Sequence, residues 1–85
     1  MIIGVVGSST MGKGLVQHIA NCGIEVRMNA RRQEALDEAM KYIEGQYDFM
    51  ISRGWLEADK KEPNLQRIQA STDMTILKDC DVVIE

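Results

Sequence analysis

The sequence is poor in the residue types that usually mark metal, redox and disordered segments. Its 85 residues include one proline, one histidine and two cysteines, and only 5% are aromatic. Scarce proline argues against a disordered chain. Cys22 and Cys80 form no CxxC pair, which argues against a metal or redox site, and we expect free, partly buried thiols. His18 has no carboxylate three or four residues later, which favours a surface or packing role over acid–base catalysis.

Long apolar runs and an excess of positive charge are also missing. No apolar run approaches the ~20 residues that a membrane-spanning helix needs, and no basic segment precedes an apolar one at the N-terminus, as it would in a secretory leader. The net charge is -3, whereas domains that bind nucleic acid usually have a basic surface. We therefore expect no membrane partner, no nucleic-acid partner and a cytoplasmic location.

The first thirty residues carry the most informative pattern. Residues 1–6 form an apolar run typical of a strand buried on both faces of a parallel sheet. A helix is expected from residue 10 or 11 to 22, because apolar residues recur along it at helical spacing; they are Met11, Leu15, Val16, Ile19 and Ala20. Gly23 suits the left-handed residue that ends a helix. Residues 24–29 then alternate between apolar and polar side chains, which predicts a strand with one wetter face.

A glycine-containing turn lies between this first strand and the first helix. In the dinucleotide-binding GxGxxG turn, the first glycine allows the tight turn, the second lets backbone approach the pyrophosphate, and the third lets helix pack on strand. Gly7 and Gly12 keep this pattern, and Ser9 replaces the middle glycine. Because the N-terminus of a helix attracts anions, we predict that the diphosphate of a dinucleotide binds here, at Gly7, Ser8, Ser9, Thr10, Met11 and Gly12.

The remaining residues predict a long helix and several short elements. Apolar residues recur at spacings of three and four over residues 32–52, and Gly54 is expected to end this helix. Pro63 suits the first turn of a short helix that carries Leu65 and Ile68. A short strand at 68–71, a helical turn at 74–77 and a strand at 81–85 complete the chain.

Alternating strands and helices predict an α/β fold with a parallel sheet and right-handed crossovers. The expected architecture is the first half of a Rossmann-like sheet, with four strands in the order 3-2-1-4 and covering helices. Residues 1–85 would form one dinucleotide-binding domain or part of one, since complete domains usually have ~100–200 residues. The apolar edge at residues 82–85 would invite pairing with another chain. We therefore expect either a fragment of a longer protein or a homodimer formed along this edge.

Several motifs together resemble one enzyme family. They are Ile3-Gly4-Val5-Val6-Gly7, Thr10-Met11-Gly12-Lys13-Gly14, Ala35-Leu36, Ser71-Thr72-Asp73 and the segment from Asp79 to Glu85. In this order they resemble the NAD-binding domain of the 3-hydroxyacyl-CoA dehydrogenases over the whole chain. The resemblance implies hydride transfer between the 3-hydroxyl of an acyl-CoA and a nicotinamide cofactor, a reaction of fatty acid metabolism.

The chain departs from the pattern of that family at two positions of the cofactor site. Ser9 places a side chain where backbone should approach the pyrophosphate; it either weakens binding or donates a hydrogen bond to a phosphate oxygen. Where the family has an acidic residue that holds the adenosine ribose, this chain has Ala30, followed by Arg31 and Arg32. An acid would repel a 2′-phosphate, whereas an arginine accommodates one. NADP is therefore favoured over NAD, unless the two arginines are only a solvated helix start.

The catalytic histidine of the family, its carboxylate partner and its substrate-orienting serine and asparagine all lie beyond the matched region. The resemblance therefore assigns no catalytic residue here, and we do not expect this chain to transfer hydride by itself. Two functions remain open: the cofactor-binding portion of a 3-hydroxyacyl-CoA dehydrogenase, and a non-catalytic nucleotide-binding or self-associating module. Tight dinucleotide binding would favour the first, and self-association without binding would favour the second.

Overall fold

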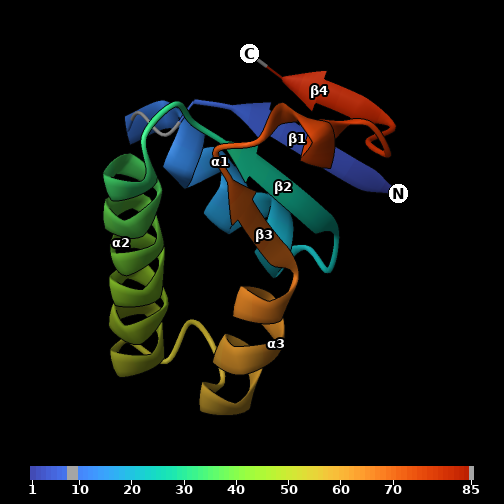
Figure 1. The fold of residues 1–85 in the computed structure, drawn as a ribbon. Helices are drawn as coiled ribbons and strands as arrows, with labels where there is room; N and C mark the ends of the chain where they lie inside the picture. Colours follow the sequence, from blue (N-terminus) through green and yellow to red (C-terminus); the bar gives the residue numbers. More distant parts are fainter. Residues whose placement is uncertain (8–9, 85) are drawn as a thin grey trace.

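The computed structural model describes residues 1–7 and 10–84, with Thr10 described by its backbone alone. Four strands form one parallel sheet, and the helices connect them (Figure 1). In chain order the elements are β1 (Ile2–Val6), α1 (Thr10–Asn21), β2 (Glu25–Asn29), α2 (Gln33–Ser52), η1 (Ala58–Lys60), α3 (Lys61–Gln66), β3 (Ile68–Ser71), η2 (Met74–Leu77) and β4 (Val82–Ile84).

The sheet has the strand order β3-β2-β1-β4, with all three pairings parallel. This confirms the predicted first half of a Rossmann-like fold. Every predicted helix and strand is present, and most boundaries agree within one or two residues. The exception is the short helix before β3. It begins at Lys61, continues from η1, and ends at Gln66, so that Ile68 belongs to the strand.

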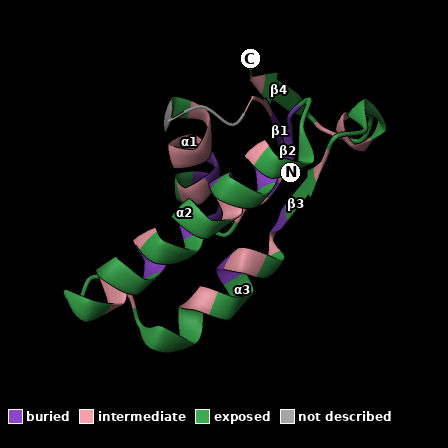
Figure 2. Cartoon of the chain, turned by 60° about the vertical axis from the view of Figure 1, so that its left-hand side comes forward, coloured by how far each residue is buried: buried purple, intermediate pink, exposed green. Residues whose placement is uncertain are grey.

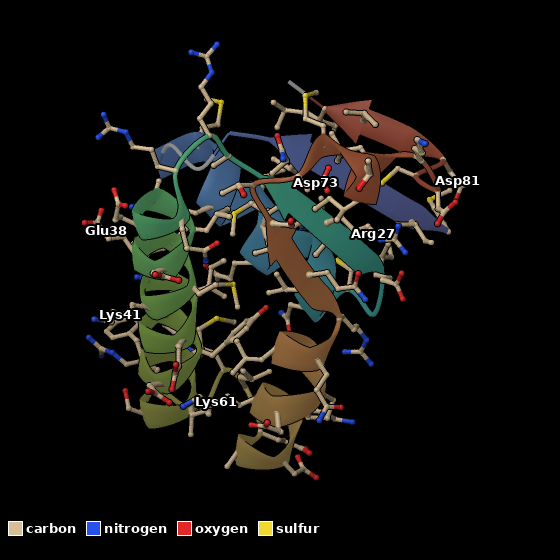
Figure 3. All side chains as sticks on the ribbon, viewed as in Figure 1. Arg27, Glu38, Lys41, Lys61, Asp73 and Asp81 are labelled. Carbon is tan, nitrogen blue, oxygen red and sulfur yellow. The ribbon has the colours of Figure 1, made fainter. Side chains whose placement is uncertain are left out.

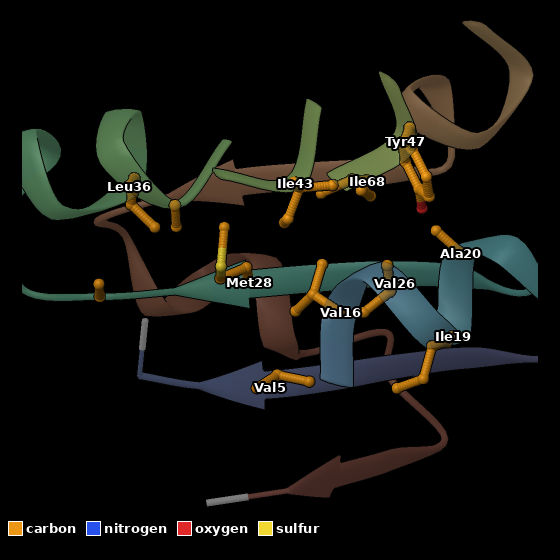
Figure 4. Packing of buried hydrophobic residues seen from close by; sticks show 12 residues of the cluster. Val5, Val16, Ile19, Ala20, Val26, Met28, Leu36, Ile43, Tyr47 and Ile68 are labelled. Carbon is orange, nitrogen blue, oxygen red and sulfur yellow. The ribbon is translucent and has the colours of Figure 1, made fainter. Parts of the chain in front are cut away.

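The two faces of the sheet are covered unequally. Helices α1 and α2 pack on one face, where Val5, Val26 and Met28 are buried beneath them (Figure 4). Neighbouring strand residues point to the opposite face. There, a Cβ atom added at Gly4 would lie 2.8 Å from Leu77 Cδ2 and 2.9 Å from Cys80 Sγ. The segment between β3 and β4, which includes η2, therefore covers the second face.

The core lies between the sheet and the inner stripes of the two long helices. Helix α1 contributes Val16, Ile19 and Ala20, and α2 contributes Leu36, Ala39, Ile43 and Tyr47. In Figure 2 the buried positions of α2 alternate with exposed ones along the helix, as expected when one stripe packs inward. Tyr47 also donates a hydrogen bond from its hydroxyl to the backbone oxygen of Gln17 at 2.8 Å. This bond joins α2 to α1.

Two glycines end the long helices as predicted. Gly23 has φ +85°, and its N–H donates to the oxygen of Ala20. Gly54 has φ +76°, and its N–H donates to the oxygen of Ile51. Both residues adopt the left-handed conformation that glycine reaches without steric cost.

The predictions for the side chains of Met11 and Cys22 are wrong. Met11 was expected in the apolar stripe of α1, but it is 83% exposed. It lies in the first turn of the helix, beyond the part that packs on the sheet. Cys22 was expected to be partly buried, but it is exposed after the last turn of α1, where its Sγ lies 3.9 Å from His18 Nε2. Cys80 is half-buried, as expected.

Candidate nucleotide-binding site

A cavity of about 780 Å³ lies where the carboxyl ends of β1 and β2 meet the start of α2 and the segment after β3. Ligands in open α/β sheets bind at this end of the strands. The volume lies within the usual range of small-molecule and cofactor sites, roughly 300–1,000 Å³. The described residues that line the cavity are Val6, Gly7, Asn29, Ala30, Arg31, Arg32, Ala35, Thr72 and Met74.

Gly7 begins the turn at the floor of this cavity. Its φ of +105° is disfavoured for residues with a Cβ atom, and its N–H donates to the backbone oxygen of Asn29 at 2.7 Å. A Cβ atom added to Gly7 would meet nothing within 4 Å among the described residues. No described residue therefore fills this side of the backbone, which suits a turn that binds a bulky anion.

Helix α1 starts directly after this turn, at Thr10, and has no acidic residue in its first turn. Its N-terminal N–H groups and partial positive charge suit a phosphate. Ser8 and Ser9 lie outside the described residues, and so does the side chain of Thr10. The proposed contacts of these residues, including the two alternatives for Ser9, stay predictions.

The structure places Ala30, Arg31 and Arg32 together on the cavity, between the end of β2 and the start of α2. Ala30 is buried, whereas both arginines are exposed. Neither arginine forms an ion pair within the described part of the chain. Arg32 is the N-cap residue of α2, with extended backbone and no capping hydrogen bond from its side chain. Both guanidinium groups are thus available to an anionic ligand.

Thr72 and Met74 supply another wall of the cavity, and no sequence pattern predicted them as site residues. They belong to the connection that leads from β3 into η2. Two short-range hydrogen bonds shape this connection: Asp73 N donates to Ser71 Oγ at 3.0 Å, and Thr75 N donates to Asp73 Oδ1 at 2.9 Å. The bond from Thr75 lowers the pKa of the Asp73 carboxyl. Ser71-Thr72-Asp73 carried a family resemblance, but no spacing rule placed them near the turn at Gly7.

Asn29 is a further lining residue that the sequence patterns did not predict. It was expected on the wetter face of its strand, but it is only 5% exposed. Its backbone oxygen accepts the bond from Gly7 N, and its Nδ2 donates to the oxygen of Ser71 at 3.0 Å. An asparagine at the carboxyl end of a strand could have signalled this role, because its amide can bond to the backbone of a neighbouring segment.

The lining chemistry fits a nucleotide with several phosphates better than a metal ion. The described lining includes two arginines and no acidic residue. No group of three or more potential metal ligands occurs in the described part of the chain. Within the same residues, no helix is both long enough and apolar enough to cross a membrane.

Comparison with known proteins gives a consistent result. The family model described as "3-hydroxyacyl-CoA dehydrogenase, NAD binding domain" matches residues 2–85. A 3-hydroxybutyryl-CoA dehydrogenase from Clostridioides difficile is 36% identical over 86 residues, which cover all of this chain and 30% of that protein. A probable 3-hydroxybutyryl-CoA dehydrogenase from Deinococcus radiodurans is also 36% identical, over 85 residues and 30% of its length.

Solved structures agree with the sequence relatives. The crystal structure of 3-hydroxybutyryl-CoA dehydrogenase from Escherichia coli superposes with a TM-score of 0.93 and 32% identity, covering 98% of this chain and 18% of that one. The (S)-3-hydroxybutyryl-CoA dehydrogenase from Ralstonia eutropha also gives 0.93 and 32%, covering 96% of this chain and 29% of that one. The chain thus spans less than a third of the length of these relatives.

Proposed function

Because the chain belongs to the family of 3-hydroxyacyl-CoA dehydrogenase NAD-binding domains, we propose that the cavity at the carboxyl end of its sheet binds a nicotinamide dinucleotide. The pyrophosphate lies against the turn from Gly7 to Gly12 and the N-terminus of α1. The adenosine half lies between Arg31 and Arg32 on one side and Thr72 and Met74 on the other. The observation that carries this proposal is the cavity itself, which Gly7 lines together with two arginines that form no ion pair with any described residue.

We further propose that NADP is preferred over NAD. A carboxylate at the end of β2 would accept hydrogen bonds from the ribose hydroxyls of NAD and repel a 2′-phosphate. This chain has the buried methyl group of Ala30 there, beside two exposed guanidinium groups. Guanidinium and phosphate form charge-assisted, often bidentate hydrogen bonds. The phosphate of NADP therefore gains an attraction, while the ribose of NAD lacks its usual acceptor.

Calorimetric titration of the chain with NADPH and NADH tests both parts. We expect NADPH to bind more tightly, Arg31→Ala to reduce the difference, and Ala30→Asp to reverse it. Arg53→Ala is the matched control, because it removes an arginine with the same charge from the other end of α2, where it stacks on Phe49 and Trp55. Equal affinities for both dinucleotides would refute the NADP preference. No binding of either at millimolar concentration would refute the site.

In the whole enzyme, we propose that this domain serves the oxidation of a 3-hydroxyacyl-CoA, similar to 3-hydroxybutyryl-CoA, or the reverse reduction. The bound nicotinamide supplies the hydride acceptor or donor. The residues of this chain bind the cofactor and hold its adenosine and diphosphate in place, and none of them is proposed to move a proton. A cytoplasmic location stays a prediction, which cell fractionation can check.

Self-association through β4 is the second proposed property. β4 pairs with β1 on one side and lies at an edge of the sheet, and Val82 and Val83 are 49% and 43% exposed. A free apolar strand edge can pair with a second copy of the chain. Sedimentation should then show a dimer that Val83→Lys dissociates. A monomer with rapid hydrogen exchange at residues 82–84 would exclude the dimer. Dimerisation without dinucleotide binding would favour the non-catalytic module.

A further inference from the structure

Two polar side chains of β2 reach from the sheet to the segment that forms one wall of the cavity. Arg27 and Asn29 point to the same face of the sheet, because they are two residues apart in a strand. This is the face that η2 covers. In Figure 3, Arg27 lies on β2 close to the η2 region that carries Asp73. Arg27 bonds to the backbone of η2, in the connection between β3 and β4, and Asn29 bonds to the backbone of Ser71, directly before that connection.

Arg27 holds the far end of this connection. Its Nη1 donates to the backbone oxygen of Ile76 at 2.8 Å and lies 3.5 Å from Asp79 Oδ2. Its Nη2 lies 3.4 Å from Glu25 Oε2. The Arg27 side chain is only 14% exposed, whereas its two carboxylate partners, Glu25 and Asp79, are 43% and 78% exposed. The bond to the oxygen of Ile76 is therefore the contact that ties Arg27 to η2 most directly. Nε has no hydrogen-bond partner among the described residues. The polar contacts of the guanidinium are therefore made by its two Nη atoms.

Asn29 holds the near end. Its Nδ2 donates to the backbone oxygen of Ser71, the last residue of β3. Its own backbone oxygen accepts the N–H of Gly7. One residue therefore links the glycine turn at the floor of the cavity to the start of the opposite wall.

Residues 72–74, between these two anchors, contain both wall residues of the cavity. Thr72 is exposed and Met74 is 64% exposed, and η2 contains no buried residue. The hydrophobic core therefore does not fix this wall. Its position depends on the local turn at Asp73 and on the bonds from β2.

We propose that Arg27 and Asn29 are positioning residues for the nucleotide cavity: they hold residues 72–74 at the distance from Arg31 and Arg32 that the adenosine half of the dinucleotide requires. This inference rests on the proposed dinucleotide-binding function. Arg27 is not among the described lining residues, and Asn29, which is, is assigned its role through the bond to Ser71 and not through a contact with the ligand. They act through the backbone oxygens of Ser71 and Ile76. Replacing Arg27 or Asn29 therefore leaves the charges of Arg31 and Arg32 in place.

The test compares four variants of the chain by titration with NADPH and with adenosine 2′,5′-bisphosphate, which contains only the adenosine half. Arg27→Met and Asn29→Leu each remove the donor and place no negative charge at the cavity. We expect about five- to tenfold weaker binding of both ligands, as the loss of one or two partly buried hydrogen bonds produces. Arg27→Lys keeps a cationic donor and should recover most of the affinity. Gln69→Met is the control, since Gln69 pairs with Arg27 in the register and faces the same side.

Amide hydrogen exchange of the ligand-free protein gives a readout that does not depend on binding. Exchange at Asp73 and Thr75 should accelerate in Arg27→Met and Asn29→Leu but not in Gln69→Met. Unchanged exchange, or equal losses of affinity in Arg27→Lys and Arg27→Met, would overturn the proposal. If the wild-type chain binds neither ligand, the proposed function fails; faster exchange in the two variants would still support the positioning role, and unchanged exchange would refute it.

Discussion

Tyr47→Phe should be less stable than the wild type at neutral pH and more stable than the wild type at high pH. Tyr47 is fully buried between α2 and α1, and its hydroxyl donates to the oxygen of Gln17 at 2.8 Å. Burial raises the pKa of this phenol to about 12, although the charge of Arg67 acts in the opposite direction. Tyr47→Phe removes both the hydrogen bond and the titrating group.

Two contributions to the free energy of unfolding oppose each other: the hydrogen bond of Tyr47 and the ionisation of its phenol. At neutral pH the variant loses the bond to Gln17, which costs about 1 kcal/mol. The unfolded chain releases the tyrosine proton near pH 10, whereas the folded chain keeps it to about pH 12. The unfolded state binds fewer protons in this window, so the wild type loses about 1.4 kcal/mol of stability per pH unit, up to roughly 2.7 kcal/mol. The variant lacks this loss, and it should become the more stable protein above about pH 11.

Urea denaturation of both proteins from pH 7 to 11.5 measures this crossing. The comparison of the two curves cancels the titration of the lysines, which both proteins share. Tyr42→Phe is the matched control on the same helix: it leaves Tyr47 in place, so the alkaline loss should persist. A stability difference between wild type and Tyr47→Phe that stays constant over this range would refute the reasoning, because Tyr47 would then ionise equally in both states.

Three further substitutions test the packing and the turn. Gly4→Ala should destabilise the fold by about 1–3 kcal/mol, because the new methyl group would overlap Leu77 and Cys80; urea denaturation measures this, and an unchanged midpoint would contradict the tight contact. Ile43→Ala should cost about 2–5 kcal/mol as a fully buried core truncation, and a loss below 1 kcal/mol in the same assay would show that the site collapses. Gly7→Ala should cost about 1–3 kcal/mol through backbone strain alone, and NADPH titration should show weaker binding; wild-type stability would mean that the turn adopts another conformation.

The sequence was sufficient for the architecture because each strand and helix carries its own local signal. The stripe of α2, the terminating glycines and the apolar run of β1 are short-range patterns, and chain order with right-handed crossovers then determines the sheet. The turn at Gly7 and the cluster of Ala30, Arg31 and Arg32 were likewise predictable, because motif and resemblance both point to them. The structure brings the two groups together on one cavity.

The wall of that cavity could not be predicted in the same way. Thr72 and Met74 approach Arg32 only after β3 has paired with β2, and no periodicity encodes that distance. The alternation in β2 suggested that Arg27 and Asn29 faced water. They are instead largely buried, and their donors bond to backbone oxygens: Arg27 to that of Ile76 in η2, and Asn29 to that of Ser71 at the end of β3. The predicted burial of Met11 was wrong for the opposite reason. Its spacing fits the apolar stripe of α1, but the stripe continues past the point where the sheet ends, so Met11 is exposed.

The pairing between Ile2 and Asp81 has a consequence for the order of folding. Ile2 N donates to Asp81 Oδ2 and Asp81 N donates to Ile2 O, both at 2.8 Å, across 79 positions of sequence. Closing so long a loop costs more entropy than closing the shorter β1–β2 and β2–β3 crossovers. β4 should therefore add to the sheet last, after a three-stranded intermediate with α1 and α2 has formed. Until that step, the edge of β1 that pairs with β4 stays open and could bind a strand from another molecule.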